Sequence, residues 1–196
     1  MDSSRIVVIG AALPLATQVV HEALRRGMSV VAHVDSIDDA SHLPKEAVRR
    51  VGELGDARYL QRLFEGAGAV VLSGRELATR EQEQELAAAR DVKGAQAEPT
   101  TTGAAAENAA PTVSALAPES LKLLVECAAE AGVKRIVLLS TGEIYAAARG
   151  PIDESAPRRA LMPAELRLIA AEDRLLELCR DNAPSLTILR PGVVYG

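Results

Sequence analysis

The sequence has no tryptophan and contains only one phenylalanine and three tyrosines among its 196 residues. Proteins that bind single-stranded nucleic acid stack bases on aromatic side chains, so this scarcity argues against that function. The 22 Lys and Arg residues are outnumbered by 27 Asp and Glu residues and are scattered along the chain. Binding to nucleic acid or to an anionic membrane calls for a basic patch, so neither is expected.

Long apolar runs are also absent, since none approaches the ~18–20 residues that a membrane-spanning helix needs. The N-terminal stretch "MDSSRIVVIG" has neither the charged start nor the cleavage site of a secretory signal peptide. We therefore expect a soluble, cytoplasmic protein with a core of Ala, Val, Leu and Ile.

Cysteine and histidine are too few for a metal site or a Ser/His/Asp triad. Cys127 and Cys179 are far apart in the sequence, and His21, His33 and His42 all lie in the first 42 residues. We expect the cysteines to be small buried side chains in a reducing compartment.

Apolar β-branched runs alternate with helical segments along most of the chain. Residues 5–10 and 28–34 have few polar interruptions, as is typical of parallel strands buried on both faces. The segment between them has helical spacing, with Pro14 near its start and Gly27 at its end. The same alternation predicts helix, strand, helix, strand, helix and strand over 57–68, 69–74, 118–132, 133–140, 163–181 and 185–196. The fold class is therefore α/β, a doubly wound parallel sheet in one domain over 1–196.

Residues 76–118 interrupt this rhythm as an insertion. Residues 76–93 are highly charged, which predicts a solvated helix, and residues 94–118 are rich in Ala, Thr and Pro, which predicts a mobile segment. Two roles remain open for the insertion, a partner-binding arm or a tolerated linker between a strand and a helix.

Three motifs in order resemble those of a known family: "GVKRIVLLSTGEIY" at 132–145, "PIDESAP" at 151–157 and "LRPGVVYG" at 189–196. They are similar to motifs of the extended short-chain dehydrogenase/reductases, the NAD-dependent sugar epimerases and dehydratases. The resemblance implies a Rossmann-like domain. Such enzymes usually continue for a further substrate-binding subdomain after the last motif, and we expect that subdomain to be missing here.

The resemblance also allows the cofactor loop to be tested residue by residue. The family's Gly-x-x-Gly-x-x-Gly loop falls on Gly10, Leu13 and Ala16. Leu13 places a side chain where the backbone must approach the pyrophosphate. Pro14 has no N–H to offer at a helix N-terminus that should bind phosphate.

Other positions of the family's cofactor site also lack the expected residue. The acidic residue expected at the end of the second strand falls on Val34, and Asp35 is one residue late, which reverses the direction of its side chain. The degenerate set of cofactor-binding candidates is Gly10, Ala12, Leu13, Asp35 and Gly74. We expect no tightly bound cofactor, with NAD(P) possible only at low affinity.

The residues at the family's catalytic positions also argue against the family's activity. The family's Tyr and Lys at i and i+4 of one helix fall on Ala164 and Leu168, neither of which can transfer a proton. Thr141 and Glu143 remain at the supporting and base positions, but the acid position is Gly142. We expect no catalytic residues, with Thr141 and Glu143 as vestiges.

The sequence thus favours a non-catalytic pseudo-dehydrogenase that serves as a scaffold or regulatory protein-interaction module. In the family, subunits often dimerise through the helices that correspond to 118–131 and 163–181, so we expect a homodimer. The apolar face of the first helix is formed by Leu121, Leu124, Val125 and Ala128. Two alternatives remain: a divergent NAD(P)-dependent epimerase or dehydratase completed by other residues, and a sensor that binds NAD(P) or another nucleotide weakly.

Overall fold

The computed structural model describes residues 5–74, 77–78, 116–145, 152–180 and 184–192. These residues form a six-stranded sheet in which neighbouring strands are parallel and the strand order is β3-β2-β1-β4-β5-β6. The strands are β1 (Arg5–Ile9), β2 (Ser29–Val34), β3 (Val48–Val51), β4 (Ala69–Leu72), β5 (Arg135–Leu139) and β6 (Ser185–Leu189). The predicted doubly wound, Rossmann-like sheet is confirmed.

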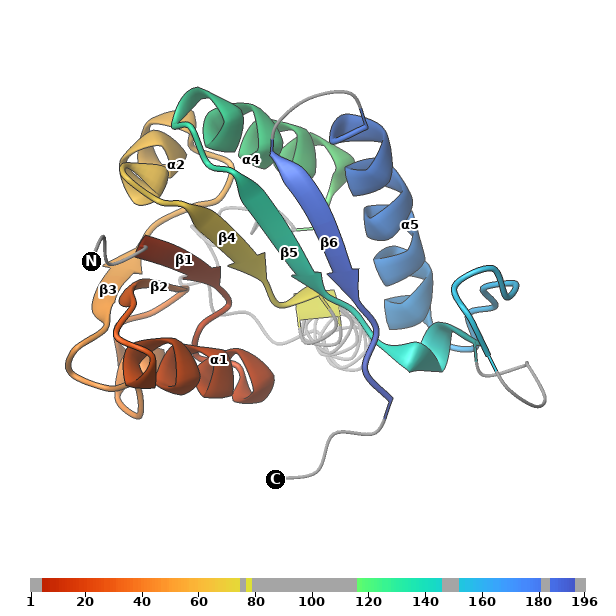
Figure 1. Ribbon diagram of the computed structural model, residues 1–196, viewed down its shortest axis with the longest axis horizontal. Coiled ribbons are helices and arrows are strands. Elements are labelled where there is room, and N and C mark those ends of the chain that lie inside the picture. The colour runs from red at the N-terminus through yellow and green to blue at the C-terminus, as the bar shows by residue number, and fades with distance from the viewer. Residues whose placement is uncertain (1–4, 75–76, 79–115, 146–151, 181–183, 193–196) are drawn as a thin grey trace, which may run out of the picture.

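Among the described residues, four helices flank the sheet on two sides. Helix α1 (Pro14–Arg25) lies on one face, and α2 (Ala57–Phe64), α4 (Pro118–Glu130) and α5 (Pro163–Leu178) lie on the other (Figure 1). Three of them begin with proline, which has the φ angle of a helix and needs no N–H partner there. Helix α2 is capped instead by Asp56, whose carboxylate accepts a hydrogen bond from the amide of Arg58 at 2.8 Å.

Alternate residues of each strand enter two separate cores. In β1, Val7 and Ile9 pack toward α2, α4 and α5, whereas Ile6 and Val8 pack toward α1. This alternation is the reason that the strands are almost continuously apolar in sequence. All six strands end at the same carboxyl edge of the sheet.

Both ends of the predicted insertion are corrected by the structure. Leu77 and Ala78 are helical and buried, so the prediction of a solvated helix is wrong for them. At the other end Leu116 is buried and Pro118 is the first residue of α4, so the mobile segment does not extend to 118. Leu77, Ala78 and Leu116, at the two ends of the insertion, are buried because their apolar side chains pack in the core. The remaining prediction for the insertion, over 79–115, lies outside the described residues.

A buried histidine makes the stability of this fold dependent on pH. His33 in β2 is 1 % exposed, its Nε2 donates to the carbonyl of Gly52 at 3.0 Å, and its ring centroid lies 5.8 Å from that of Tyr59. Burial lowers the pKa of His33 below its ordinary value of 6.5. Below about pH 6.5 the unfolded chain binds a proton at His33, whereas the folded chain keeps this ring neutral. The contribution of His33 to the free energy of unfolding is therefore fully present above about pH 6.5 and is lost as the pH falls toward the folded-state pKa.

We expect a His33→Gln variant to lose less free energy of unfolding than the wild type when the pH falls from about 7.5 to 5. Urea unfolding at several pH values measures this difference. The exposed His21 supplies the control, because His21→Gln should keep the wild-type pH dependence. Equal pH dependence in the wild type and in His33→Gln would contradict the assignment.

Candidate functional site

The carboxyl edge of the sheet brings the predicted site residues together. Gly10 follows β1, Asp35 follows β2 and Gly74 lies just after β4, while Thr141 and Glu143 follow β5. The chain winds in opposite directions from β1 and from β4, so a switch point lies between these neighbouring strands. Ligands of open α/β sheets bind at such a point.

At the switch point, the turn after β1 is covered by two leucines. Gly10 has a φ of 72°, a conformation that favours glycine, and its carbonyl accepts a hydrogen bond from the amide of Leu13 at 3.0 Å. A Cβ built on Gly10 would lie 2.9 Å from Cδ1 of Leu13 and 3.4 Å from the side chain of Leu77. The turn therefore presents apolar side chains where a dinucleotide-binding turn presents bare backbone.

Backbone groups of the same turn are engaged within the protein. The amide of Ala11 donates to the carbonyl of His33 at 3.0 Å, and the Nε2 atom of His42 donates to the carbonyl of Ala12 at 3.1 Å. Pro14 opens α1 and has no N–H. The amides of Ala11 and Leu13 are thus directed to protein carbonyls rather than to an anion at the edge of the sheet.

The position for binding a ribose has no carboxylate in the strand itself. Val34, the last residue of β2, is 1 % exposed and packs beneath α1, whereas Asp35 is exposed. Their opposite exposure agrees with the alternation expected from the sequence.

Helix α5 presents an apolar face at the positions of the family's Tyr and Lys. Leu168 is 1 % exposed, and its Cδ1 lies 3.0 Å from a Cβ built on Gly74. Ala164 is partly buried against the same core. The sequence predicts an apolar stripe on this helix, and the structure buries its other members too, Ala171 and Leu175.

Thr141 and Glu143 differ in their exposure to solvent. Thr141 is 2 % exposed, and its Oγ1 accepts a hydrogen bond from the amide of Glu143 at 3.2 Å, whereas the Glu143 side chain is exposed. Between them, the amide of Gly142 donates to the carbonyl of Pro191 at 2.7 Å, and a Cβ on Gly142 would lie 3.2 Å from that oxygen. The chain leaving β6 thus occupies the space next to the family's acid position.

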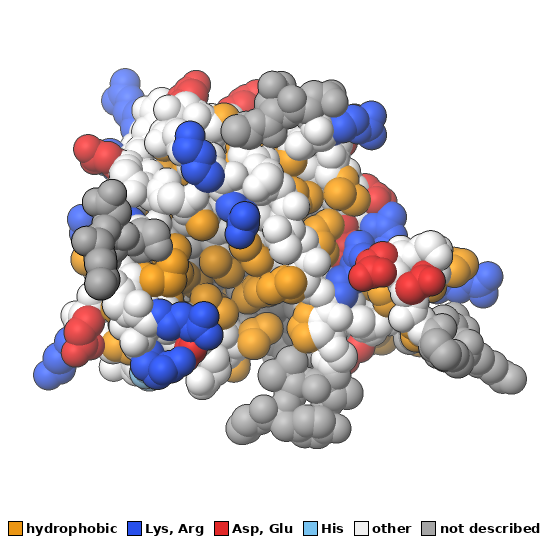
Figure 2. All heavy atoms as spheres, in the orientation of Figure 1, with side chains coloured by type: hydrophobic (Ala, Val, Ile, Leu, Met, Phe, Trp, Pro, Cys, Tyr) orange, Lys and Arg blue, Asp and Glu red, His pale blue; other side chains and the backbone are white. Residues whose placement is uncertain are grey.

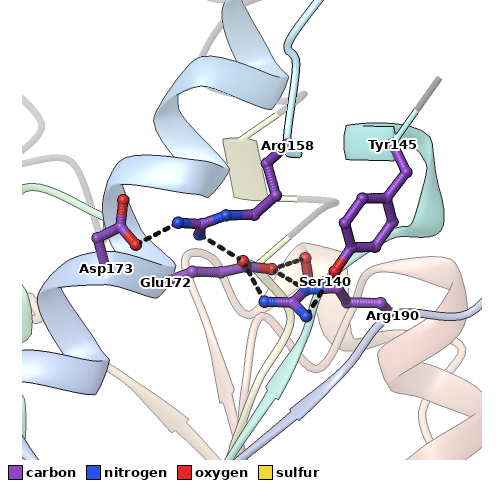
Figure 3. Close-up of polar contacts among 6 residues, drawn as sticks. All are labelled: Ser140, Tyr145, Arg158, Glu172, Asp173 and Arg190. Carbon is purple, nitrogen blue, oxygen red and sulfur yellow. Dashed lines mark hydrogen bonds and ion pairs between the residues drawn. The ribbon is translucent and has the colours of Figure 1, made fainter. Parts of the chain in front are cut away.

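A buried carboxylate that the sequence analysis missed organises the edge between β5, β6 and α5 (Figure 3). Glu172 of α5 is 0 % exposed. Arg190, just after β6, binds it with two hydrogen bonds, from Nε at 3.0 Å and from Nη2 at 2.8 Å. Arg158 Nη1 donates to the same carboxylate at 3.1 Å, and the hydroxyl of Ser140 donates at 2.5 Å. We call these four residues the Glu172 cluster.

Two further residues, Tyr145 and Asp173, contact the arginines of the Glu172 cluster. Arg190 Nη1 donates to the hydroxyl of Tyr145 at 2.8 Å, and Arg158 Nη2 donates to Asp173 at 2.6 Å. The hydrogen bonds that Arg190 donates to Glu172 raise the pKa of Arg190, which therefore stays protonated. The contacts drawn as dashed lines in Figure 3 join side chains that are distant in sequence, so the cluster holds these segments together.

The contacts of this cluster include residues from two of the motifs that resemble the family. Ser140 and Tyr145 belong to the motif at 132–145 and Arg190 to the motif at 189–196, and all three serve to hold β5, β6 and α5 together. One signal in the sequence pointed to it: Glu172 directly follows Ala171, inside the apolar stripe, where a carboxylate needs a partner.

The described residues include a hollow but no cluster that could hold a metal ion. No group of three or more His, Cys, Asp or Glu side chains could hold a metal ion there. A hollow between the C-terminal ends of α2 and α4 lies at the amino edge, away from the switch point, and is lined by Gln61, Arg62, Glu65, Gly66, Glu130 and Ala131. Among all the residues that the structure describes, no helix has the length and apolar character required to span a bilayer.

Comparison with known proteins identifies the family. The model of the NAD(P)H-binding family matches residues 10–195. No curated protein matches the chain. Among solved structures, a short-chain dehydrogenase/reductase superfamily protein from Agrobacterium tumefaciens with bound NAD is 22 % identical with a TM-score of 0.64, and the match covers 95 % of this chain and 48 % of that one.

Two epimerases have the same fold. The UDP-glucose 4-epimerase of Thermotoga maritima is 18 % identical with a TM-score of 0.63, covering 95 % of this chain and 54 % of that one. The UDP-N-acetylglucosamine 4-epimerase of Bacillus cereus is 16 % identical with a TM-score of 0.65, covering 96 % and 60 %. The chain thus spans about half the length of these structures. It belongs to the NAD(P)H-binding family, and its Rossmann fold is the one found in these short-chain dehydrogenase/reductase and epimerase structures.

Proposed function

We propose that this chain is a non-catalytic member of its family that acts as a scaffold or regulatory protein-interaction module. The observation that carries the proposal is the burial of Leu168, at the lysine position of the family, against Gly74 and the core. A proton-transferring pair at this place needs a polar helix face that reaches the substrate. The face formed by Ala164 and Leu168 instead stabilises the fold by apolar contact.

The turn after β1 supports the same conclusion. A pyrophosphate fits at Gly10 only if the side chains of Leu13 and Leu77 move away, because both lie within 3.4 Å of a Cβ built there. Moving them would expose apolar surface that the turn now covers. Ordinary dinucleotide affinity is therefore lost in this proposal.

A turnover assay tests the catalytic half of the proposal. The protein is incubated with NAD⁺ or NADP⁺ and with UDP-glucose or UDP-N-acetylglucosamine, and products are followed by chromatography and by absorbance of the reduced cofactor. We expect no product above the protein-free blank. Sustained turnover would contradict the proposal and favour a divergent epimerase or dehydratase.

A second candidate, a weak NAD(P) sensor, is favoured by the family match and by the bound NAD in the Agrobacterium neighbour. A substitution at Gly10 distinguishes the sensor from the scaffold. If the chain senses a dinucleotide, Gly10→Val should abolish the response, since φ is 72° there and no space remains for a side chain. A response that survives Gly10→Val would contradict sensing at this turn.

The sequence suggested two helices for the proposed homodimer, α4 and α5, and these differ in the apolar surface that they expose. Leu121, Leu124, Val125 and Ala128 of α4 are all buried in the core of their own subunit, so they are not available to a partner. That face of α4 packs against the sheet and the neighbouring helices. Exposed apolar side chains lie instead on and before α5, at Leu161, Met162, Leu166 and Leu176.

We expect self-association to depend on α5. Leu166 is 62 % exposed, and Leu166→Glu would place a charge in an interface through this helix. Sedimentation velocity at high micromolar concentration should show a dimer for the wild type and a monomer for Leu166→Glu. Ile37→Glu, at an equally exposed residue far from α5, is the control and should remain dimeric. A monomeric wild type would remove the prediction.

A further inference from the structure

The turn after β1 does not fit the dinucleotide that the name of its family implies. The NAD(P)H-binding family model includes this turn, since the match begins at residue 10. The backbone of the turn agrees with the match. Gly10 has a φ of 72°, and Leu13, the N-cap residue of α1, has an extended backbone with a φ of −78° and a ψ of 148°. The misfit therefore comes from side chains and from one missing N–H group.

Two leucine side chains from different parts of the chain meet over Gly10, and we call Leu13 and Leu77 the leucine pair. A Cβ built on Gly10 would lie 2.9 Å from Cδ1 of Leu13 and 3.4 Å from Cγ and Cδ2 of Leu77. Leu77 is 6 % exposed, and its amide donates to the carbonyl of Ser73 at 3.0 Å, while the amide of Ser73 donates to the carbonyl of Ile9 at 3.3 Å. These bonds hold Leu77 at the switch point between β1 and β4. Figure 2 shows hydrophobic side chains gathered over the middle of the sheet, just above α1 in this view, so the apolar character is not limited to the turn.

Pro14 is the competing cause of the misfit. It is the first residue of α1 and has no N–H to offer an anion. However, α1 is 12 residues long and keeps the partial positive charge of its N-terminus. The loss of one hydrogen bond to a charged group weakens binding about ten- to hundred-fold, but it leaves the space for the ligand. Filled space excludes the ligand altogether, and Leu77 can leave only by bringing its buried side chain into water.

We propose that the leucine pair, and not the missing N–H of Pro14, closes this turn to the diphosphate of a dinucleotide, and that removal of both leucine side chains opens it. The inference rests on the proposed function and deepens it by naming the groups that abolish dinucleotide affinity. The backbone does not need a leucine at position 13, since glycine is favoured over leucine at an N-cap. Leu13→Gly and Leu77→Ala therefore uncover Gly10 and leave its φ unchanged.

Titration of the protein with NADH by isothermal titration calorimetry measures this opening without any turnover. We expect no saturable binding to the wild type up to about 1 mM, and a Kd below about 0.1 mM for the double variant that combines Leu13→Gly with Leu77→Ala. Each single substitution should have a smaller effect, because the other leucine still covers Gly10. The double variant should bind NADH without turning over a nucleotide sugar, since Ala164 and Leu168 are unchanged.

Three further variants separate the two causes of the misfit. Pro14→Ser restores an N–H at the start of α1 but leaves the leucine pair in place, so it should bind NADH no better than the wild type. Gly10→Val, added to the double variant, should abolish the regained binding, because it fills the uncovered space and strains a backbone with a φ of 72°. Leu63→Ala, at a residue of α2 that is 1 % exposed, controls for a general loosening of the core and should not bind NADH.

Three results would overturn the inference: saturable binding of NADH to the wild type, a folded double variant that binds no better than the wild type, or Pro14→Ser alone binding as tightly as is expected of the double variant. If the double variant fails to fold, as judged by its melting transition, Leu77→Val replaces Leu77→Ala in it. The inference and the proposed function fail separately. A double variant that does not bind NADH would leave the absence of turnover intact, whereas sustained turnover by the wild type would overturn the proposed function.

Discussion

Replacing Glu172 by Ala is expected to lower the free energy of unfolding by about 3–5 kcal/mol, the cost of leaving a buried charge without its partner. Glu172 is 0 % exposed, and the side chains of Arg190 and Arg158 that bind it are 17 % and 26 % exposed. Without the carboxylate, two guanidinium groups and the hydroxyl of Ser140 lose their acceptor together. Glu172→Gln keeps the volume and one acceptor oxygen, so it should lie between the wild type and the alanine variant.

Asp173 provides a matched control for this prediction. It is the next residue of α5, it binds the same Arg158 at 2.6 Å, and its side chain is 54 % exposed. Exposed ion pairs contribute about 0–1 kcal/mol, so Asp173→Asn should have a small effect. Urea unfolding of the three variants measures the difference. Equal losses for Glu172→Ala and Asp173→Asn would contradict a structural role for the Glu172 cluster.

Truncation of Leu168 to Ala is expected to cost about 2–5 kcal/mol, as for other large-to-small substitutions in a packed core. Leu168 is 1 % exposed and packs against the position of Gly74. In an enzyme with an open pocket at this place, the same truncation would face solvent and cost little. The stability of this variant therefore reports whether the helix face at the catalytic positions has become core.

Leu166 gives the comparison on the same helix. It is 62 % exposed, and Leu166→Ala should change the free energy of unfolding by less than about 0.5 kcal/mol at a protein concentration where the chain is monomeric. Denaturant melts of both variants, with circular dichroism as the probe, measure the two losses. A loss for Leu168→Ala as small as that for Leu166→Ala would contradict the burial of the catalytic face.

The sheet was predictable from the sequence because most strands are buried on both faces and most helices begin with proline. Strand β3 was missed, since its sequence "VRRV" holds two arginines at the edge of the sheet and none of its residues is buried. The apolar face of α4 was recognised, but its periodicity could not tell whether that face meets the core or a partner. Both outcomes require the same spacing of apolar residues.

The site was less predictable because its decisive contacts join residues that are distant in the chain. The covering of Gly10 by Leu77 and the pairing of Glu172 with Arg190 connect different elements. No local periodicity encodes such pairs. The sequence alone gave the prediction that Ala164 and Leu168 stand at the family's Tyr and Lys positions, because the neighbouring Pro163 sets the register, and this alignment stays a prediction.

The most direct test of the account is the melting temperature with and without about 1 mM NAD⁺, NADH, NADP⁺ or NADPH. A ligand at about 100 times its Kd adds about 2.7 kcal/mol, which raises the melting temperature of a domain of this size by roughly 5–10 °C. Because Leu13 and Leu77 cover Gly10, we predict no measurable shift with any of the four dinucleotides. A shift of roughly 5–10 °C with any of them would show that the turn after β1 opens to a dinucleotide, and would contradict the proposed loss of ordinary dinucleotide affinity.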